Sequence, residues 1–364
     1  MNNIKSFFNS GKAIFFLMVF ICCVIGSAVL KIAAVVILPF TIAVLLAFVV
    51  YPIVKGLDKR NCPHILSVVL IILLIIAGFS IFGAVFFTSG RMIVVRFPQY
   101  EDRIKALYDW AADLFLLPND EALSIWQNLW EQAAIRSFVR DFTLSFSNTL
   151  FQFVSSAILV MVFLGFILFE ASYFKEKLEN AFESRSVRIN KMGIDLMSQV
   201  TRYLAAKFFI SLVNGVIFAL GFHLVGLDFA ILWGVLQFLL NFIPNLGSIL
   251  SGIIISLFAL IQFWPNPVPI IMVISVILAV NLFVSGIFDP KIVGDHVGIS
   301  PLVVLVSLAI WGWIWGFTGM VIAVPMTVII KIVCENVPIM EPVSILLGTR
   351  KSIRARKAER ERLK

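Results

Sequence analysis

The sequence predicts an all-α, polytopic helical membrane protein with about eight hydrophobic segments. Of its 364 residues, 60% are hydrophobic and 14% are charged, and the mean hydropathy is +1.02. Soluble domains are closer to about half apolar and about one quarter charged. The apolar residues also form uninterrupted runs, since neither 13–30 nor 65–89 contains a charged residue. A run of about 20 apolar residues crosses the hydrocarbon layer as a helix, so we expect the chain to be embedded in a membrane.

Apolar blocks divide the chain into candidate membrane segments. They lie at 13–30, 32–54, 65–89, 150–169, 208–226, 229–262, 268–288 and 301–331. From these blocks we expect five regions. They are N-terminal spans (1–89), an extracytoplasmic amphipathic segment (90–149), a fourth span with a cytoplasmic loop (150–207), an inverted-repeat transport core (208–331) and a cytoplasmic basic tail (332–364).

The charged residues predict the orientation, because lysine and arginine accumulate in cytoplasmic loops. Loop 55–64 has three basic residues and one acid, and segment 170–207 has seven and five. The stretch 350–364 has eight basic residues and two glutamates, whereas 90–149 has six and eight. We therefore expect both termini in the cytoplasm of a bacterial inner (plasma) membrane, with Lys31 and segment 90–149 outside. We also expect the basic tail to bind anionic lipid headgroups.

The outer segment 90–149 has apolar residues at helical spacing, which is typical of an amphipathic helix. They are Ile104, Leu107, Tyr108 and Ala111, followed by Phe138, Phe142 and Phe146. Such a helix would pack on the membrane surface or against a neighbouring subunit, or would form a solvated cap.

Two apolar blocks are too long for one crossing and are interrupted in the middle. Block 229–262 has 34 residues around the stretch NFIPNLG, and block 301–331 has 31 residues with several glycines and a proline. Proline removes a helical hydrogen bond and glycine weakens a helix. We therefore expect two re-entrant hairpins, the first entering from outside and the second from the cytoplasm, with 268–288 crossing between them. Eight single crossings would leave the tail on the same side, and this alternative stays open.

The hairpin interpretation predicts an inverted repeat around a transport site. The spans that precede the two broken blocks carry Asn214 and Asn281 among apolar neighbours. The first break adds Gln237, Asn241 and Asn245, with Ser248 and Ser251 nearby. Interrupted helices in inverted repeats recur in secondary transporters, and neutral amides suit a small polar solute. Hydrogen bonding between helices is the structural alternative.

Motifs typical of nucleotide binding, nucleophilic catalysis or metal binding are not found in the sequence. There is no G-x-x-x-x-G-K-[ST] motif, no nucleophile with its base, and no cysteine or histidine spacing typical of metal sites. We expect neither an enzyme nor a cofactor or metal. Asp289, at the end of span 268–288, is a candidate for proton or cation coupling, and an ordinary helix-ending Asp-Pro is the alternative.

The sequence resembles the AI-2E (PerM) family of bacterial transporters. The similarity lies in YPIVKGLDKR (51–60), NFIPNLGSILSG (241–252) and the stretch DPKIVGDHVGISPLVVLVSLAIWGWIWGFTGMVIAVPMTVIIK (289–331). Carried over by position, the hairpin motif falls on Pro244 and Gly247, and the Asp-Pro motif on Asp289. The last motif falls on Pro301, Gly312, Gly316, Gly319 and Pro325. The chain departs from the family pattern at Asn245 and Ser248.

The resemblance implies an inner-membrane, homo-oligomeric transporter. One branch of the family exports the quorum-sensing signal autoinducer-2, and other branches are associated with sodium or lithium/proton exchange. We expect an exporter of a small polar solute, with autoinducer-2 or a related signalling molecule first, working by alternating access. Sodium or lithium/proton antiport and a non-transporting membrane scaffold are the alternatives.

Overall fold

The computed structural model describes residues 10–114, 152–171, 173, 177, 186–244, 246–284, 298–336 and 340–349. Every named element in this part of the chain is a helix. The bounds are α1 Ser10–Ile32, α2 Ala34–Asp58, α3 His64–Leu114, α6 Ser186–Val225, α7 Ala230–Leu240, α8 Leu246–Phe263, α9 Pro267–Phe283, α11 Pro301–Asn336 and α12 Glu341–Leu347. Residues Gln152–Ala171 form a further helix.

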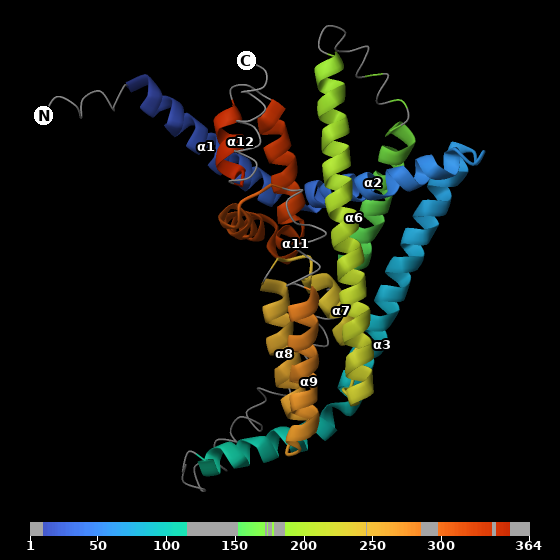
Figure 1. Ribbon diagram of the computed structural model, residues 1–364, viewed down its shortest axis with the longest axis vertical. Coiled ribbons are helices and arrows are strands. Elements are labelled where there is room, and N and C mark those ends of the chain that lie inside the picture. The colour runs from blue at the N-terminus through green and yellow to red at the C-terminus, as the bar shows by residue number, and fades with distance from the viewer. Residues whose placement is uncertain are drawn as a thin grey trace, which may run out of the picture.

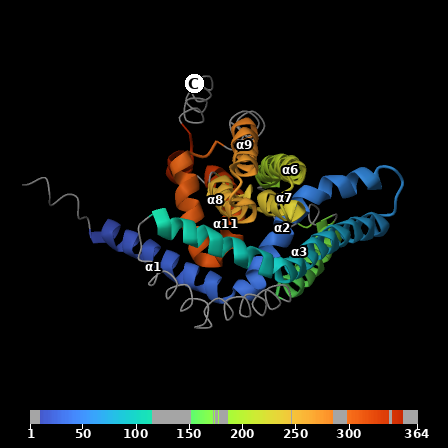
Figure 2. The same ribbon diagram turned by 90° about the horizontal axis from the view of Figure 1, so that it is seen from below.

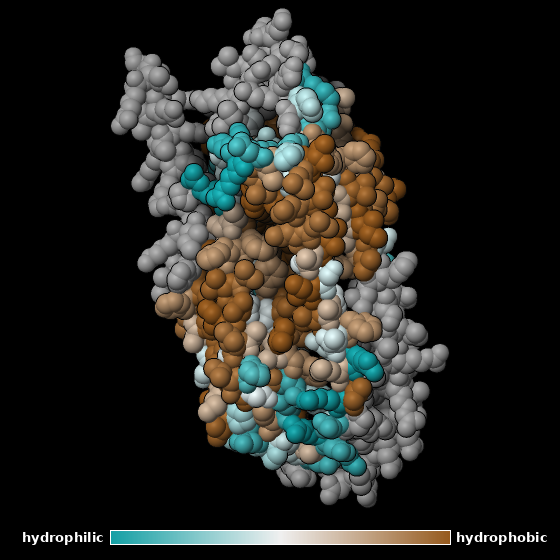
Figure 3. Space-filling view, turned by 90° about the vertical axis from the view of Figure 1, so that its right-hand side faces the viewer, coloured by the Kyte–Doolittle hydropathy of each residue, from teal (hydrophilic) through white to brown (hydrophobic). Residues whose placement is uncertain are grey.

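The described helices confirm the all-α membrane fold. Six are long and apolar enough to cross a bilayer, namely Ala34–Asp58, His64–Ile93, Gln152–Ala171, Met197–Val225, Leu246–Phe263 and Pro301–Glu335. Two shorter apolar helices are Ala230–Leu240 and Pro267–Phe283. Apolar side chains gather across the middle of one face of the molecule, with polar side chains towards both ends (Figure 3).

Helices α3 and α6 extend beyond the apolar blocks that the sequence analysis assigned to the membrane. α6 begins at Ser186, inside the segment that was predicted as a cytoplasmic loop, and α3 continues to Leu114. No proline lies between 186 and 225, so nothing in the sequence interrupts the helical hydrogen bonds there. The last part of α3 turns beneath the end of α8 (Figures 1 and 2). The predicted amphipathic helix therefore begins as a continuation of α3, and 115–149 lie outside the described residues.

The first long block is folded back on itself as a helical hairpin, α7–α8. α7 has 11 residues, about 16 Å, and is too short to cross a bilayer of about 30 Å. The chain turns at 241–244, and the open ends meet again, because the backbone N–H of Asp228 donates to Gln262 Oε1 at 2.8 Å. At the turn, a Cβ on Gly247 would overlap the carbonyl oxygen of Leu240. Glycine is required at this close approach.

The second long block is also folded back on itself, within α11. The backbone leaves the helical region at Trp315 and Gly316, and Gly316 has a positive φ of 61°. The two arms then run side by side, because Ser307 Oγ donates to the carbonyl of Ala323 at 3.0 Å. A Cβ on Gly319 would overlap the carbonyl oxygen of Trp311, as at the first hairpin.

The two hairpins meet in one hydrophobic core. Leu240 and Ile243, at the turn of α7–α8, pack in the same buried cluster as Leu308, Trp311 and Trp315 of α11. Figure 1 shows α7–α8 in one half of the molecule and α11 in the other. Together the two hairpins extend along the height that α6 covers alone.

Candidate functional site

The site predicted around the first break lies between α6 and α7, which pack very closely. A Cβ on Gly215 of α6 would lie 2.7 Å from the carbonyl oxygen of Gly234 of α7, and the reciprocal distance is 2.5 Å. Only glycine lets two helix backbones approach so closely. This contact fixes the relative height of the two helices and thereby places the polar residues of α6 beside those of α7.

Three of the predicted amides come together at this interface. Asn241, at the end of α7, donates through Nδ2 to Ser211 Oγ of α6 at 2.9 Å. Gln237 lies one turn before Asn241 on α7, and Asn214 lies one turn after Ser211 on α6. Asn214 and Gln237 are fully buried, with 0% exposure. Their side-chain nitrogen and oxygen atoms have no hydrogen-bond partner among the described residues.

Asn281 of α9 is level with the same turn. Gly221 of α6 lies against Val276 of α9, and Gly252 of α8 lies against Ile277. Since α9 runs antiparallel to α6 and α8 (Figure 1), Asn281 falls about one turn further towards the tip of the α7–α8 hairpin. Its Oδ1 is also buried and lacks a partner in the described part of the chain.

The remaining predicted residues serve the turns or lie outside the described structure. Pro244 is in the first turn, where its carbonyl accepts a hydrogen bond from the Leu246 N–H at 2.7 Å. Pro301 begins α11, Gly312 packs against Met320, and Pro325 lies inside the second arm rather than at the break. Asn245 and Asp289 lie outside the described residues.

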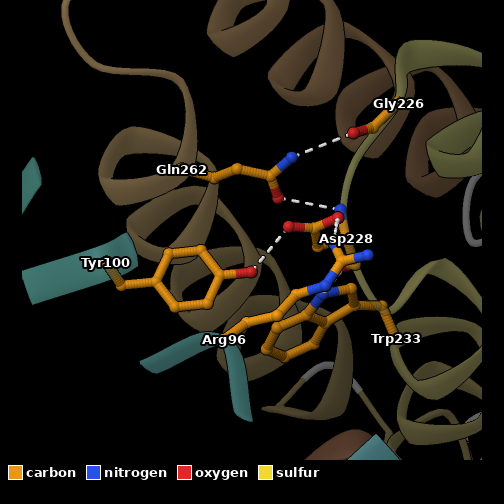
Figure 4. A network of polar contacts seen from close by, with 6 residues as sticks. All are labelled: Arg96, Tyr100, Gly226, Asp228, Trp233 and Gln262. Carbon is orange, nitrogen blue, oxygen red and sulfur yellow. Dashed lines mark hydrogen bonds and ion pairs between the residues drawn. The ribbon is translucent and has the colours of Figure 1, made fainter. Parts of the chain in front are cut away.

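A second polar cluster, which the sequence analysis did not predict, closes the open end of the α7–α8 hairpin (Figure 4). Arg96 Nη1 of α3 donates to Asp228 Oδ1 at 2.5 Å, and the Tyr100 hydroxyl donates to Asp228 Oδ2 at 2.6 Å. Gln262 Nε2 of α8 donates to the Gly226 carbonyl at 2.9 Å. The Trp233 indole donates to the Asp228 carbonyl at 3.0 Å. We call these residues and Gly226 the Asp228 network.

The Asp228 network is partly buried, which strengthens it. Tyr100 and Gln262 are each 6% exposed, and Tyr100 also packs edge-on against Phe258. Burial, and secondly the hydrogen bond to Asp228, raise the pKa of Tyr100 above its ordinary value. The hydrogen bond to Asp228 likewise raises the pKa of Arg96. Tyr100 therefore remains a donor, and Arg96 a cation, at neutral pH.

The sequence offered a weak signal for this network. Arg96 and Tyr100 lie in a polar segment with several similar residues, and their partner is more than 120 residues away. Gln262 ends an apolar block, where a polar residue is ordinary. Among the described residues, no group of three or more His, Cys, Asp and Glu side chains could hold a metal ion.

Comparison with known proteins places this chain in a family. The profile described as AI-2E family transporter matches residues 14–339. A protein of Haemophilus influenzae, named as a candidate transport protein, is 32% identical over 332 residues, covering 89% of this chain and 93% of the relative. A Borreliella burgdorferi protein with the same kind of name is 30% identical over 338 residues, covering 93% and 91%. The AI-2 transport protein TqsA of Escherichia coli is 27% identical over 320 residues, covering 88% and 91%.

Proposed function

Because the chain belongs to the AI-2E family of transporters, we propose that it exports a small polar solute, with autoinducer-2 as the first candidate. One relative, TqsA, carries AI-2 transport in its name. The two chains are 27% identical. This similarity supports transport of the same class of small polar solute, and autoinducer-2 is one member of that class. The candidate site of this chain must therefore carry the rest of the argument.

The two fully buried amides, Asn214 and Gln237, carry the proposal. Buried polar groups in proteins are nearly always hydrogen-bonded, and leaving one unsatisfied costs about 1–3 kcal/mol. Here the donors and acceptors of both side chains are buried without partners among the described residues, within about a turn of the Asn241–Ser211 contact near the tip of the hairpin. A solute with hydroxyl and carbonyl groups would hydrogen-bond to these amides. Such bonds would contribute affinity and would explain why polar side chains are buried here.

The two hairpins supply the movement in this proposal. We propose that both re-enter the membrane, with α7–α8 from outside and α11 from the cytoplasm, and that the site becomes accessible from each side in turn. The supporting geometry is the meeting of Leu240 and Ile243 with the arms of α11. Movement of either hairpin would open one half of the barrier while the other half stays packed.

We propose three further features of the assembly. The lysine- and arginine-rich tail binds anionic headgroups of the inner membrane. The chain forms a homo-oligomer, using apolar faces that remain exposed on α3 and the helix Gln152–Ala171. Asp289 takes part in coupling transport to a proton or cation gradient.

The test is autoinducer-2 flux in sealed vesicles that contain the purified protein, with and without a proton gradient. Asn214→Ala and Gln237→Ala should each reduce flux at least about tenfold, the equivalent of about 1.4 kcal/mol of lost binding. Gln152→Ala is the matched control, since Gln152 is exposed at the start of its helix. Unchanged flux in both site variants, with normal amounts of folded protein, would refute the site. Absence of flux in the unmodified protein would refute the cargo.

Cation/proton exchange is the second candidate, and one observation favours it. Three buried amide oxygens without partners, on Asn214, Gln237 and Asn281, lie near the carbonyl end of α7. Oxygen ligands at broken helices coordinate sodium in several transporters. Sodium- or lithium-driven proton movement in the same vesicles, lost in Asp289→Asn, would favour this function over solute export.

A further inference from the structure

The Asp228 network joins three elements at the open end of the first hairpin. Asp228 precedes α7, Gln262 is the next-to-last residue of α8, and Arg96 and Tyr100 belong to α3. Asp228 alone accepts from both α3 side chains through its carboxylate, and bonds both arms of the hairpin through its backbone. Both polar contacts that α3 makes in this network therefore end on one carboxylate (Figure 4).

An exposed ion pair alone would not support a role, since such pairs contribute about 0–1 kcal/mol. The Arg96 side chain is 47% exposed, and taken alone it would fall in this class. The other members differ, because Tyr100 and Gln262 are buried and their polar atoms are bonded within the network. Separating the Asp228 carboxylate from α3 would leave the buried Tyr100 hydroxyl unpaired, which adds a cost to the loss of the ion pair, while Gln262 would keep its bonds to the backbone.

The network also acts on the candidate site through a short rigid path. Trp233 fixes the start of α7 by donating to the Asp228 carbonyl. Gln237 lies one turn beyond Trp233 on the same helix, and Asn241 ends that helix. A helix of 11 residues is short enough to move as a single body. Displacement of Asp228 would therefore also displace Gln237 and Asn241.

We infer that Arg96 and Tyr100 are positioning residues for transport: they latch the α7–α8 hairpin to α3 at its open end. The latch must open for the site to become accessible from that side. This inference rests on the proposed transport function, in which the hairpin moves. It concerns the movement alone and does not depend on the identity of the cargo.

The test measures access to the site from outside with a membrane-impermeant thiol reagent. The four cysteines, Cys22, Cys23, Cys62 and Cys334, are replaced by serine, and Gln237→Cys serves as reporter in the full-length chain. Asp228→Asn, which affects both contacts with α3, should raise the labelling rate about tenfold, and Arg96→Ala, which removes only the exposed ion pair, should raise it about threefold. Tyr100→Phe, which removes one bond, should raise it about threefold.

Two controls separate a latch from general loosening of the fold. Arg91→Ala removes an exposed arginine five residues earlier in α3, outside the network, and should leave the rate unchanged. Leu164→Cys reports on the separate core of α2, α3 and the helix Gln152–Ala171, where Leu164 is 0% exposed. It should stay slow in every latch variant.

The reversed pair Arg96→Asp/Asp228→Arg should bring the rate back to within about threefold of the parent, because the charge attraction is restored with opposite signs while Tyr100 still lacks its carboxylate acceptor. Unchanged labelling in the single variants, equal acceleration of the Leu164→Cys reporter, or no recovery in the reversed pair would each overturn the inference. Flux is measured in parallel without the reporter, and latch variants should alter the maximal rate more than KM. Absence of autoinducer-2 flux would count against the proposed cargo, while labelling decides the latch independently.

Discussion

Gly247 and Gly319 occupy equivalent positions in the two hairpins. Each follows a turn, and at each a Cβ would overlap a carbonyl oxygen of the opposite arm, that of Leu240 or Trp311. These oxygens belong to the backbone and cannot rotate away as a side chain could. The two arms of each hairpin can therefore pack this closely only because glycine has no side chain at these positions.

Gly247→Ala and Gly319→Ala should each destabilise the protein by at least about 1–3 kcal/mol, the usual cost of forcing an extra methyl group into a packed interior. Gly78→Ala is the control, since nothing lies within 4 Å of a Cβ at that position of α3. Its melting temperature should be unchanged or slightly higher, because alanine favours helix over glycine. Thermal unfolding of the detergent-purified variants measures both effects. Equal melting temperatures for all three would contradict the close approach.

Sequence alone predicts a polar residue at a membrane site when its neighbours are apolar. This is why Asn214, Gln237, Asn241 and Asn281 could be selected before the structure was known, although their function remains a prediction. Asp228 was itself a weak candidate for coupling, but its partners could not be selected, because Arg96 and Tyr100 lie in a polar segment with several similar residues. Their pairing depends on how the end of α3 turns beneath α8, which is a tertiary property.

At the scale of elements, the α11 turn is tied to the N-terminal helix. Trp315 is buried, and its indole nitrogen donates to the carbonyl of Leu30 in α1 at 3.0 Å. Neighbouring Trp313 is 60% exposed and lies under the Lys31 ammonium at 4.7 Å. The sequence predicted a break in this block from its glycines and proline. It could not locate the break at Trp315–Gly316, since three glycines and one proline were all candidates.

Trp315→Phe should cost about 1–3 kcal/mol of stability, because it removes the bond to the Leu30 carbonyl and leaves space beside the smaller ring at a buried position. Trp313→Phe should cost less, about 0.5 kcal/mol or below, since an exposed cation–π contact is weak and phenylalanine retains part of it. The comparison is made by denaturant unfolding in mixed micelles. A larger loss for Trp313→Phe would show that the Leu30 contact does not hold the two helices together.

At the scale of the whole molecule, the parts of the structure that adjoin basic segments lie towards the same end. The loop between α2 and α3, the start of α6 and helix α12 lie towards one end, and the Asp228 network and the α8–α9 turn lie at the other (Figure 1). The first group adjoins the basic segments of the sequence. From the positive-inside rule we therefore expect the α8–α9 turn outside.

A membrane-impermeant maleimide should label Asn266→Cys in intact cells when the four native cysteines are replaced by serine. Asn266 is exposed in the α8–α9 turn. Native Cys62, retained alone in the α2–α3 loop, should react only after the cells are opened. Labelling of Cys62 in intact cells, with Asn266→Cys protected, would reverse the proposed orientation.

The meeting of the two hairpins at mid-height has an electrical consequence. The membrane potential falls across the insulating layer between the two aqueous phases, and polar side chains at the tip of α7–α8 replace part of that insulator. If either hairpin opened as proposed, the remaining insulator would be the short packed stretch around Leu240, Trp311 and Trp315. An elementary charge carried through this stretch would experience most of the field, about 2.3 kcal/mol per 100 mV, while moving a small part of the bilayer thickness. Transport of a charged cargo would therefore depend steeply on voltage, and transport of a neutral cargo would not.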